Sequence, residues 1–147
     1  MAMNSNIPYQ DITYCMIGAA MRVHNKMGPG YRERHYQRAM TAGMRAVGLT
    51  AIEEYPFDLY LDDNWIGRIY LDHLVDDVVV VELKAVTHLL TDDERAQVIT
   101  YLAATDRKVG LLFNFGRRRL EYERILQPRI TADWPDHIRR YAWTPPG

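Results

Sequence analysis

The most informative part of this chain reads Leu71-Asp72-His73-Leu74-Val75-Asp76-Asp77-Val78-Val79-Val80-Val81-Glu82-Leu83-Lys84. Its run of valines predicts a buried strand, because β-branched residues favour strands and an unbroken apolar run is typical of a strand covered on both faces. Residues i and i+2 of a strand share a face, so Glu82 and Lys84 point the same way and Leu83 points the opposite way. Two charged side chains therefore lie together at the end of an apolar strand.

With Asp72 on the preceding strand, this set suits a divalent-metal site. Magnesium prefers oxygen ligands, and a nearby lysine can orient a water molecule or offset developing charge. The alternative is an exposed Glu82–Lys84 pair at the rim of a sheet, with Asp72 as a turn residue. The triplet alone does not decide between them.

The loop between the two strands sets a geometric condition on such a site. If Asp76 and Asp77 form a two-residue hairpin loop, Asp72 pairs with Val81 and Glu82 faces away from it. A shared site needs a loop of odd length or a bulge, which moves the register by one face.

Composition indicates one domain of ordinary size. The chain has 147 residues, 48% of them hydrophobic and 25% charged, with a formal charge of −1, which gives no global attraction to nucleic acid. Its single cysteine, Cys15, fits a reducing compartment, and its apolar neighbours predict burial. No apolar run has membrane-spanning length and residues 1–6 lack a signal-peptide pattern, so we expect a cytoplasmic protein without membrane association.

The remaining patterns predict two helices, three strands, a helix and two strands, which is an α/β or α+β layer fold with a mixed sheet. Glycine and proline at 28–30 end the first helix, and Thr91 with Glu94 has the spacing of a capping box at the start of the third. A short helix is expected near the end of the chain. The predicted helices cover residues 11–27, 31–47, 92–104 and 132–141, and the strands cover 50–61, 65–75, 78–85, 108–115 and 120–126.

An ordered set of short motifs accompanies these elements. It comprises Val23-His24 with Gly28-Pro29-Gly30; Gly30, Glu33 and Tyr36; Asp72; Val81-Glu82-Leu83-Lys84-Ala85-Val86; Gln97 with Tyr101; and Val109-Gly110-Leu111-Leu112 with Asn114-Phe115-Gly116. Together the motifs resemble the GxxExxY protein family, a branch of the PD-(D/E)xK nuclease superfamily, from residue 12 to residue 125.

This resemblance implies a restriction-endonuclease-like core over about residues 11–126 of a single domain spanning 1–147, followed by a short helix and tail at 127–147. It implies a nuclease that uses Mg²⁺ or Mn²⁺, with Asp72, Glu82, the Leu83 carbonyl and His24 as metal ligands. Lys84 would stand beside the attacking water, Gln97 and Tyr101 resemble the QxxxY element of RecB-like nucleases, and Glu33 occupies the position of a helical acid.

Several residues keep a structural alternative. His24 could satisfy the last carbonyls of its helix, Glu33 could interact with its helix dipole, and Tyr36 is expected to pack in the core. His73 follows Asp72 where relatives carry an apolar residue, and we expect it to face outward or to be partly buried with a structural role.

Basic residues supply the expected contacts to nucleic acid, for which DNA is the favoured substrate. Arg32 and Arg34 flank the proposed site together with Tyr101, whereas the charge run 117–119 lies in a turn, where such a run is usually a solvated loop rather than a DNA contact. The alternative function is a non-catalytic nucleic-acid-binding or assembly subunit that retains the nuclease fold. Homo-oligomerisation is left open.

Overall fold

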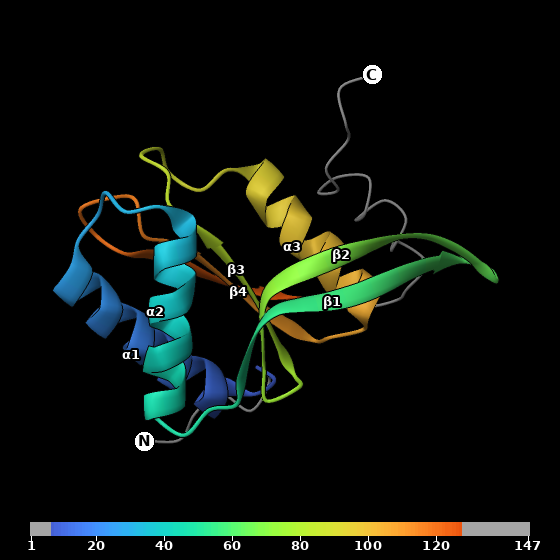
Figure 1. Ribbon diagram of the computed structural model, residues 1–147, viewed down its shortest axis with the longest axis horizontal. Coiled ribbons are helices and arrows are strands. Elements are labelled where there is room, and N and C mark those ends of the chain that lie inside the picture. Colours follow the sequence, from blue (N-terminus) through green and yellow to red (C-terminus); the bar gives the residue numbers. More distant parts are fainter. Residues whose placement is uncertain (1–6, 128–147) are drawn as a thin grey trace.

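The computed structural model describes residues 7–127, so the helix expected at 132–141 lies outside the described residues (Figure 1). The order of elements is the predicted one, and their ends lie within two residues of the predicted ends. The capping box at the start of α3 is confirmed, since Thr91 and Glu94 bond each other's backbone amides. The elements are α1 (Gln10–Met27), α2 (Glu33–Ala46), β1 (Ala51–Leu61), β2 (Asn64–Val75), β3 (Val79–Lys84), α3 (Asp92–Thr105), β4 (Val109–Asn114) and β5 (Glu121–Leu126).

The five strands form one mixed sheet in the order β1-β2-β3-β4-β5. Only β3 and β4 run parallel, with α3 as the crossover between them, and all other neighbours are antiparallel. Helices α1 and α2 lie together on one side of the sheet and α3 lies on the other (Figure 1). The predicted mixed sheet flanked by helices is therefore confirmed.

Strand β3 alternates between two apolar cores. Val79, Val81 and Leu83 pack in the core under α1 and α2. Val80 packs in the second core, with Val98 and other residues of α3. Because alternate residues share a face, Glu82 and Lys84 continue the Val80 face toward α3.

Two predicted environments are wrong. Cys15 is exposed, because the buried side of α1 runs through Thr13 and Met16 and one residue is about 100° away around a helix. His73 is fully buried, and its Nε2 lies 2.8 Å from the Thr41 hydroxyl. Burial, the main cause, lowers the His73 pKa to about 4. Tyr36 is fully buried, as expected, and stacks on Phe115.

No helix among residues 7–127 is both long and apolar enough to cross a membrane.

Candidate functional site

The hairpin between β2 and β3 has the odd loop that a shared site requires. Val75 pairs with Val79, Leu74 with Val80 and His73 with Val81, so three residues, 76–78, separate the first pair. Continuing this register by one position brings Asp72 opposite Glu82.

Asp72 and Glu82 are in direct contact. The amide of Asp72 donates to Glu82 Oε1 at 3.3 Å, and the amide of Leu83 donates to Asp72 Oδ2 at 2.7 Å. Burial raises the pKa of both carboxyls, and the charge of Asp72 raises that of Glu82 further. Two acids in this position repel each other and are poorly solvated, which is the state that a bound cation would relieve.

The backbone amide and carbonyl of Asp72 both form hydrogen bonds with side chains rather than with the backbone of neighbouring strands. Its amide goes to Glu82, and its carbonyl accepts a hydrogen bond from Gln37 Nε2 on α2 at 3.0 Å. Strands β1 and β2 pair in the same register before and after this position, but Glu54 and Asp72 themselves are not paired. Glu54 has a left-handed φ of 52°, and its Oε1 accepts a second bond from Gln37 at 3.1 Å. Gln37 and Glu54 thus fix the main chain that carries Asp72.

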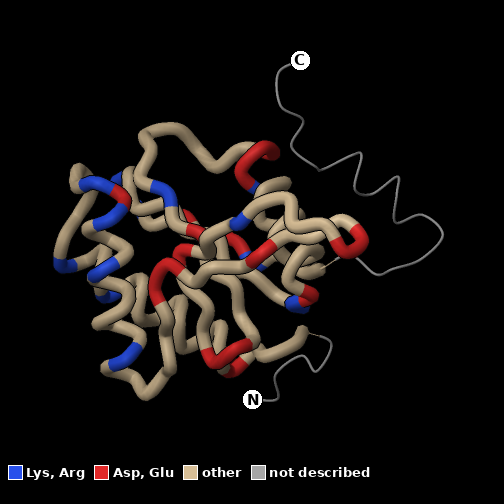
Figure 2. The backbone as a smooth tube through the Cα atoms, turned by 45° about the vertical axis from the view of Figure 1, so that its right-hand side comes forward, with Lys and Arg blue, Asp and Glu red and all other residues tan. Residues whose placement is uncertain are grey.

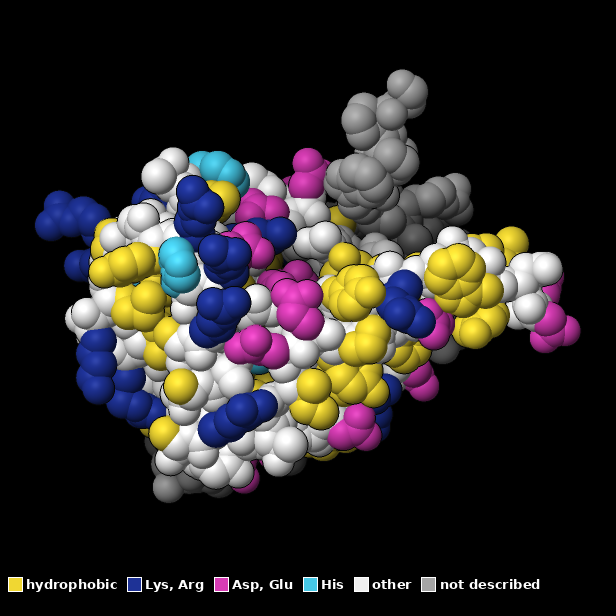
Figure 3. All heavy atoms as spheres, in the orientation of Figure 1, with side chains coloured by type: hydrophobic (Ala, Val, Ile, Leu, Met, Phe, Trp, Pro, Cys, Tyr) yellow, Lys and Arg dark blue, Asp and Glu magenta, His cyan; other side chains and the backbone are white. Residues whose placement is uncertain are grey.

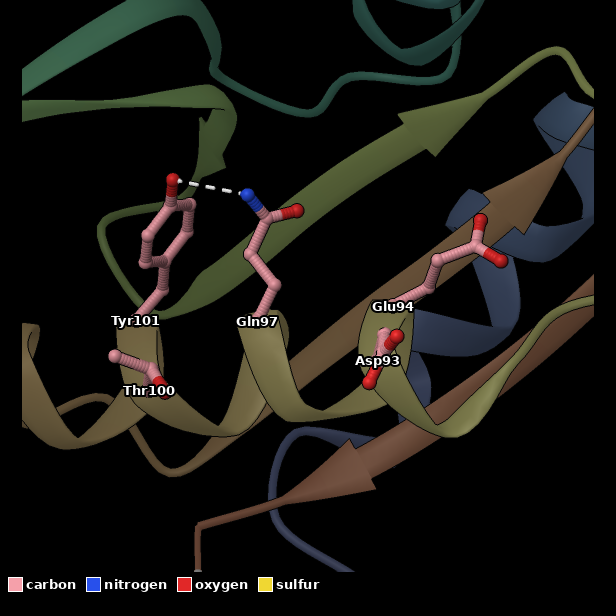
Figure 4. A pocket seen from close by; sticks show the side chains of 5 residues that line it. All are labelled: Asp93, Glu94, Gln97, Thr100 and Tyr101. Carbon is pink, nitrogen blue, oxygen red and sulfur yellow. Dashed lines mark hydrogen bonds between the residues drawn. The ribbon is translucent and has the colours of Figure 1, made fainter. Parts of the chain in front are cut away.

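Helix α3 brings two polar side chains, Gln97 and Tyr101, to the face of the sheet that carries Lys84. Lys84 Nζ donates to Gln97 Oε1 at 3.3 Å, and Gln97 Nε2 donates to the Tyr101 hydroxyl at 3.3 Å. Burial, with smaller contributions from the charges of Glu82 and Asp72, raises the Tyr101 pKa. Gln97, Tyr101, Asp93, Glu94 and Thr100 line a cavity of about 430 Å³ beside this chain of hydrogen bonds (Figure 4).

Glu33 approaches the carboxylates from the first turn of α2. Its pKa is raised, first by burial and then by the charge of Asp72, while Lys84 acts in the opposite direction. Charge effects of this kind act only between nearby groups, so Glu33 lies in the neighbourhood of Asp72 and Lys84, and its role in the site stays a prediction.

The comparisons with known proteins concern the family of the chain. Residues 10–125 match the family described as the PD-(D/E)XK nuclease superfamily. The chain belongs to the PD-(D/E)XK nuclease superfamily. A search of the curated proteins found no match. Among solved structures, the crystal structure of SSO0001 is similar with a TM-score of 0.48 and 16% sequence identity, covering 96% of this chain and 75% of that one.

The fold is accordingly the restriction-endonuclease-like α+β fold of this superfamily, whose nucleases typically use divalent metals such as Mg²⁺. The donor set of this chain fits such an ion, because adjacent Asp72 and Glu82 offer hard oxygen ligands. Within residues 7–127, no three His, Cys, Asp or Glu side chains converge closely enough to hold a metal together. The two carboxylates are thus the part of the expected ligand set that this PD-(D/E)XK chain brings together.

The structure does not bring His24 to that pair. His24 Nε2 lies 2.8 Å from the carbonyl oxygen of Arg117, in the loop between β4 and β5. One ring nitrogen is therefore engaged in joining α1 to that loop, and the metal role expected for His24 stays a prediction without geometric support.

Positive charge is concentrated beside the acids of this superfamily member. Lys and Arg gather over α1 and α2, and Asp and Glu lie over the neighbouring sheet (Figures 2 and 3). Arg32 is the N-cap of α2 and Arg34 is exposed in its first turn. Both are close in sequence to Glu33, which places their charges at the edge of the acidic site.

A buried asparagine fixes the loop that leads to α3. Asn114 Oδ1 accepts from the amides of Val86 and Gly116, and its Nδ2 donates to His88 O and Glu121 Oε1. This loop connects Lys84 to the helix that carries Gln97, so Asn114 helps to set their separation.

Sequence reasoning missed Gln37 and Glu54. Gln37 directly follows Tyr36 of the helix motif and is buried, and Glu54 lies beside Glu53 near the start of β1. The only sign of Glu54 in the sequence is the pair of acids Glu53 and Glu54 in a predicted strand. That pair does not identify which of the two acids faces Asp72.

Proposed function

We propose that this protein is a metal-dependent nuclease that hydrolyses phosphodiester bonds of nucleic acid. We further assign it to the GxxExxY branch, with Gln97 and Tyr101 as its QxxxY element. The observation that supports this function best is the contact between the half-buried Asp72 and the buried Glu82, with Lys84 on the same face.

In this proposal Asp72, Glu82 and the Leu83 carbonyl hold Mg²⁺ or Mn²⁺. The bound ion would act as a Lewis acid on the scissile phosphate. Lys84 uses one of its three donor positions on Gln97, which leaves donors to orient the attacking water and to balance charge that develops on the phosphate. Gln97 in turn keeps the lysine ammonium directed to the site, and Tyr101 closes the chain of hydrogen bonds.

Glu33 is proposed to act near the lysine. Its raised pKa brings it closer to the range in which a carboxyl group exchanges protons at neutral pH. It could therefore accept a proton from the water that Lys84 orients.

Arg32, Arg34 and Tyr101 are proposed to contact the substrate, for which DNA is the favoured class. Arginines at the start of α2 reach toward backbone phosphates, while Tyr101 lines the adjacent cavity and presents an aromatic ring for a base. We propose a cytoplasmic location and a single catalytic domain.

Cleavage assays test the proposal directly. Labelled single- and double-stranded DNA and RNA are incubated with Mn²⁺ and compared between the wild type, Lys84→Ala and the control Lys108→Ala, whose lysine is exposed and distant in sequence from the motif. We expect metal-dependent cleavage by the wild type and control, with a loss of at least about 10²-fold in Lys84→Ala, the range for loss of one transition-state donor.

The non-catalytic alternative predicts another pattern. Binding of nucleic acid without cleavage under every metal tested, together with equal affinity for the wild type and Lys84→Ala, would favour a binding or assembly subunit. Cleavage that survives unchanged in Lys84→Ala would show that the activity arises elsewhere.

A further inference from the structure

A second cavity lies at the end of the two parallel strands, and its lining is basic. It has a volume of about 790 Å³ and is lined by Thr87, Gly116 and the arginine run. That run, which we call the arginine loop, consists of Arg117, Arg118 and Arg119 between β4 and β5. No acidic residue is among the lining residues, in contrast to the cavity beside α3 with Asp93 and Glu94.

The walls of this cavity are held in place before any ligand arrives. Arg117 Nη1 donates to the Thr87 carbonyl at 3.0 Å, and the carbonyl of Arg117 meets His24 Nε2. A Cβ atom at Gly116 would collide with the backbone N and O of Val86. The loop after β3 and the loop after β4 therefore touch backbone to backbone, so binding of a ligand would have to order little of the chain.

The guanidinium groups of Arg118 and Arg119 in the arginine loop are free to bind a ligand. Arg118 and Arg119 are exposed, and neither forms an ion pair with another residue in the range 7–127. By contrast, Arg68, Arg95 and Arg107 each have a carboxylate within 3.0 Å. Unpaired guanidinium groups on a fixed loop are typical of recognition of phosphate oxygens, to which they can donate two parallel hydrogen bonds.

The position of the cavity relates it to the candidate catalytic residues. Lys84 and Asn114 form the last pair of the parallel ladder. Thr87 and Arg117 each follow that pair by three residues, a length of chain that spans at most about 11 Å. One strand of a nucleic-acid duplex carries a charge every ~3.4 Å of axis, so the cavity lies within about three phosphates of Lys84.

We propose that the arginine loop binds a phosphate of the substrate strand about one to three nucleotides from the bond that is cleaved, and that it does so without a metal ion. The location along the strand rests on the proposed nuclease function, whereas the phosphate binding itself does not. The acidic site repels phosphates until a cation is bound. The arginine loop supplies the metal-independent part of the affinity and sets a minimum length for the substrate.

The test is fluorescence anisotropy with a 3′-labelled single-stranded DNA 12-mer in EDTA, over a series of salt concentrations. The double variant Arg118→Ala/Arg119→Ala is compared with the wild type and with Arg68→Ala/Arg107→Ala, which removes the same formal charge from ion-paired arginines. We expect the arginine-loop variant to bind at least about tenfold more weakly, as for loss of charge-assisted hydrogen bonds. Its slope of log K against log salt should be smaller by about 1.4, or ~0.7 for each contact.

The control variant should bind like the wild type. Because Arg118 and Arg119 are exposed, replacing them should leave the melting curve of the protein unchanged. Equal binding by the wild type and the arginine-loop variant would overturn the proposal. A 5′-phosphorylated 12-mer distinguishes the two sources of phosphate: a preference for it that the variant loses supports a terminal phosphate, and equal, arginine-dependent binding of both oligonucleotides supports an internal one.

The same set of proteins separates this inference from the proposed function. If the wild type never cleaves but its binding depends on the arginine loop, the nuclease proposal fails and the phosphate site stands. If the wild type cleaves while the arginine-loop variant keeps its affinity and KM, the phosphate site fails and the nuclease stands. With both proposals correct, the variant raises KM and leaves kcat nearly unchanged.

Discussion

Magnesium is expected to raise the melting temperature of this protein, and Asp72→Asn is expected to remove that rise. In the metal-free protein, the carboxyls of Asp72 and Glu82 are close together in a buried site that raises the pKa of both. An ion bound between them binds the folded state only, so it stabilises that state by RT ln(1 + [L]/Kd).

The size of the shift follows from the binding equation and the length of the chain. At ten times Kd the stabilisation is about 1.4 kcal/mol. A domain near 150 residues gains roughly 2–4 °C for each kcal/mol, so the melting temperature should rise by about 3–6 °C. Differential scanning fluorimetry over a Mg²⁺ or Mn²⁺ series, starting from EDTA, measures this shift.

The variant separates the charge of Asp72 from its structural contact. Asparagine retains an oxygen that accepts the Leu83 amide, now bonded at 2.7 Å, and it removes one of two repelling charges. In EDTA, Asp72→Asn should therefore be at least as stable as the wild type. Asp72→Ala leaves that buried amide unpaired, which costs about 1–3 kcal/mol.

The effect depends on pH in a direction fixed by the raised pKa values. Between the ordinary carboxyl pKa near 4 and the raised value, the folded protein binds more protons than the unfolded chain, so its stability falls as pH rises. The advantage of Asp72→Asn over the wild type in EDTA should thus grow from about pH 4 upward and level off above the raised pKa. The contribution of His73, whose pKa is lowered, is common to both proteins and cancels in the difference.

Asp63→Asn is the matched control, because Asp63 lies exposed in the turn between β1 and β2. It should keep the full metal-dependent shift. Three results would contradict an ion bound between Asp72 and Glu82: no shift of the wild type with either ion, an equal shift of Asp72→Asn, or a markedly lower stability of Asp72→Asn in EDTA.

Three further substitutions test the surroundings of the site. Gln37→Met should lower the free energy of unfolding in urea by about 1–3 kcal/mol, since the buried carbonyl of Asp72 loses its donor, and it should weaken the metal-dependent shift; a fully retained shift would deny Gln37 its positioning role. Glu54→Gly should be more stable than Glu54→Ala by about 1–2 kcal/mol, because both remove the carboxylate and only glycine adopts the φ of 52° without cost; equal stability would show that the strand relaxes there. Gly116→Ala should destabilise the fold more than Gly110→Ala, since the new methyl group collides with the backbone of Val86 at the first position and chiefly with a side-chain methyl of Val98 at the second; chemical denaturation of both variants gives the order.

The fold could be predicted because its signals are local. Glycine and proline at 28–30, the capping residues Thr91 and Glu94, and the valine run each determine an element within a few residues. The pairing of Asp72 with Glu82 was predictable only as a condition, because one residue more or less in the loop at 76–78 exchanges the faces of the strand.

The errors and omissions concern contacts between elements. Cys15 is one position away from the buried side of α1, and apolar neighbours alone did not reveal the difference. His73 depends on Thr41 of α2, and Gln37 depends on the carbonyl of a residue in β2. Such partners are distant in sequence, so no periodicity within one element could identify them.

The buried acid pair also bears on how chains of this kind change over generations. Replacing one of its carboxylates by the corresponding amide removes a repulsion while keeping the shape, so the substitution that would abolish the proposed metal site is also expected to favour folding. Most random substitutions lower stability and are removed for that reason. The change from carboxylate to amide at this pair would not be removed for low stability. Under the proposed function, selection for activity would be the force that retains Asp72 and Glu82, and lineages released from it would lose the acids early while keeping the sheet and helices.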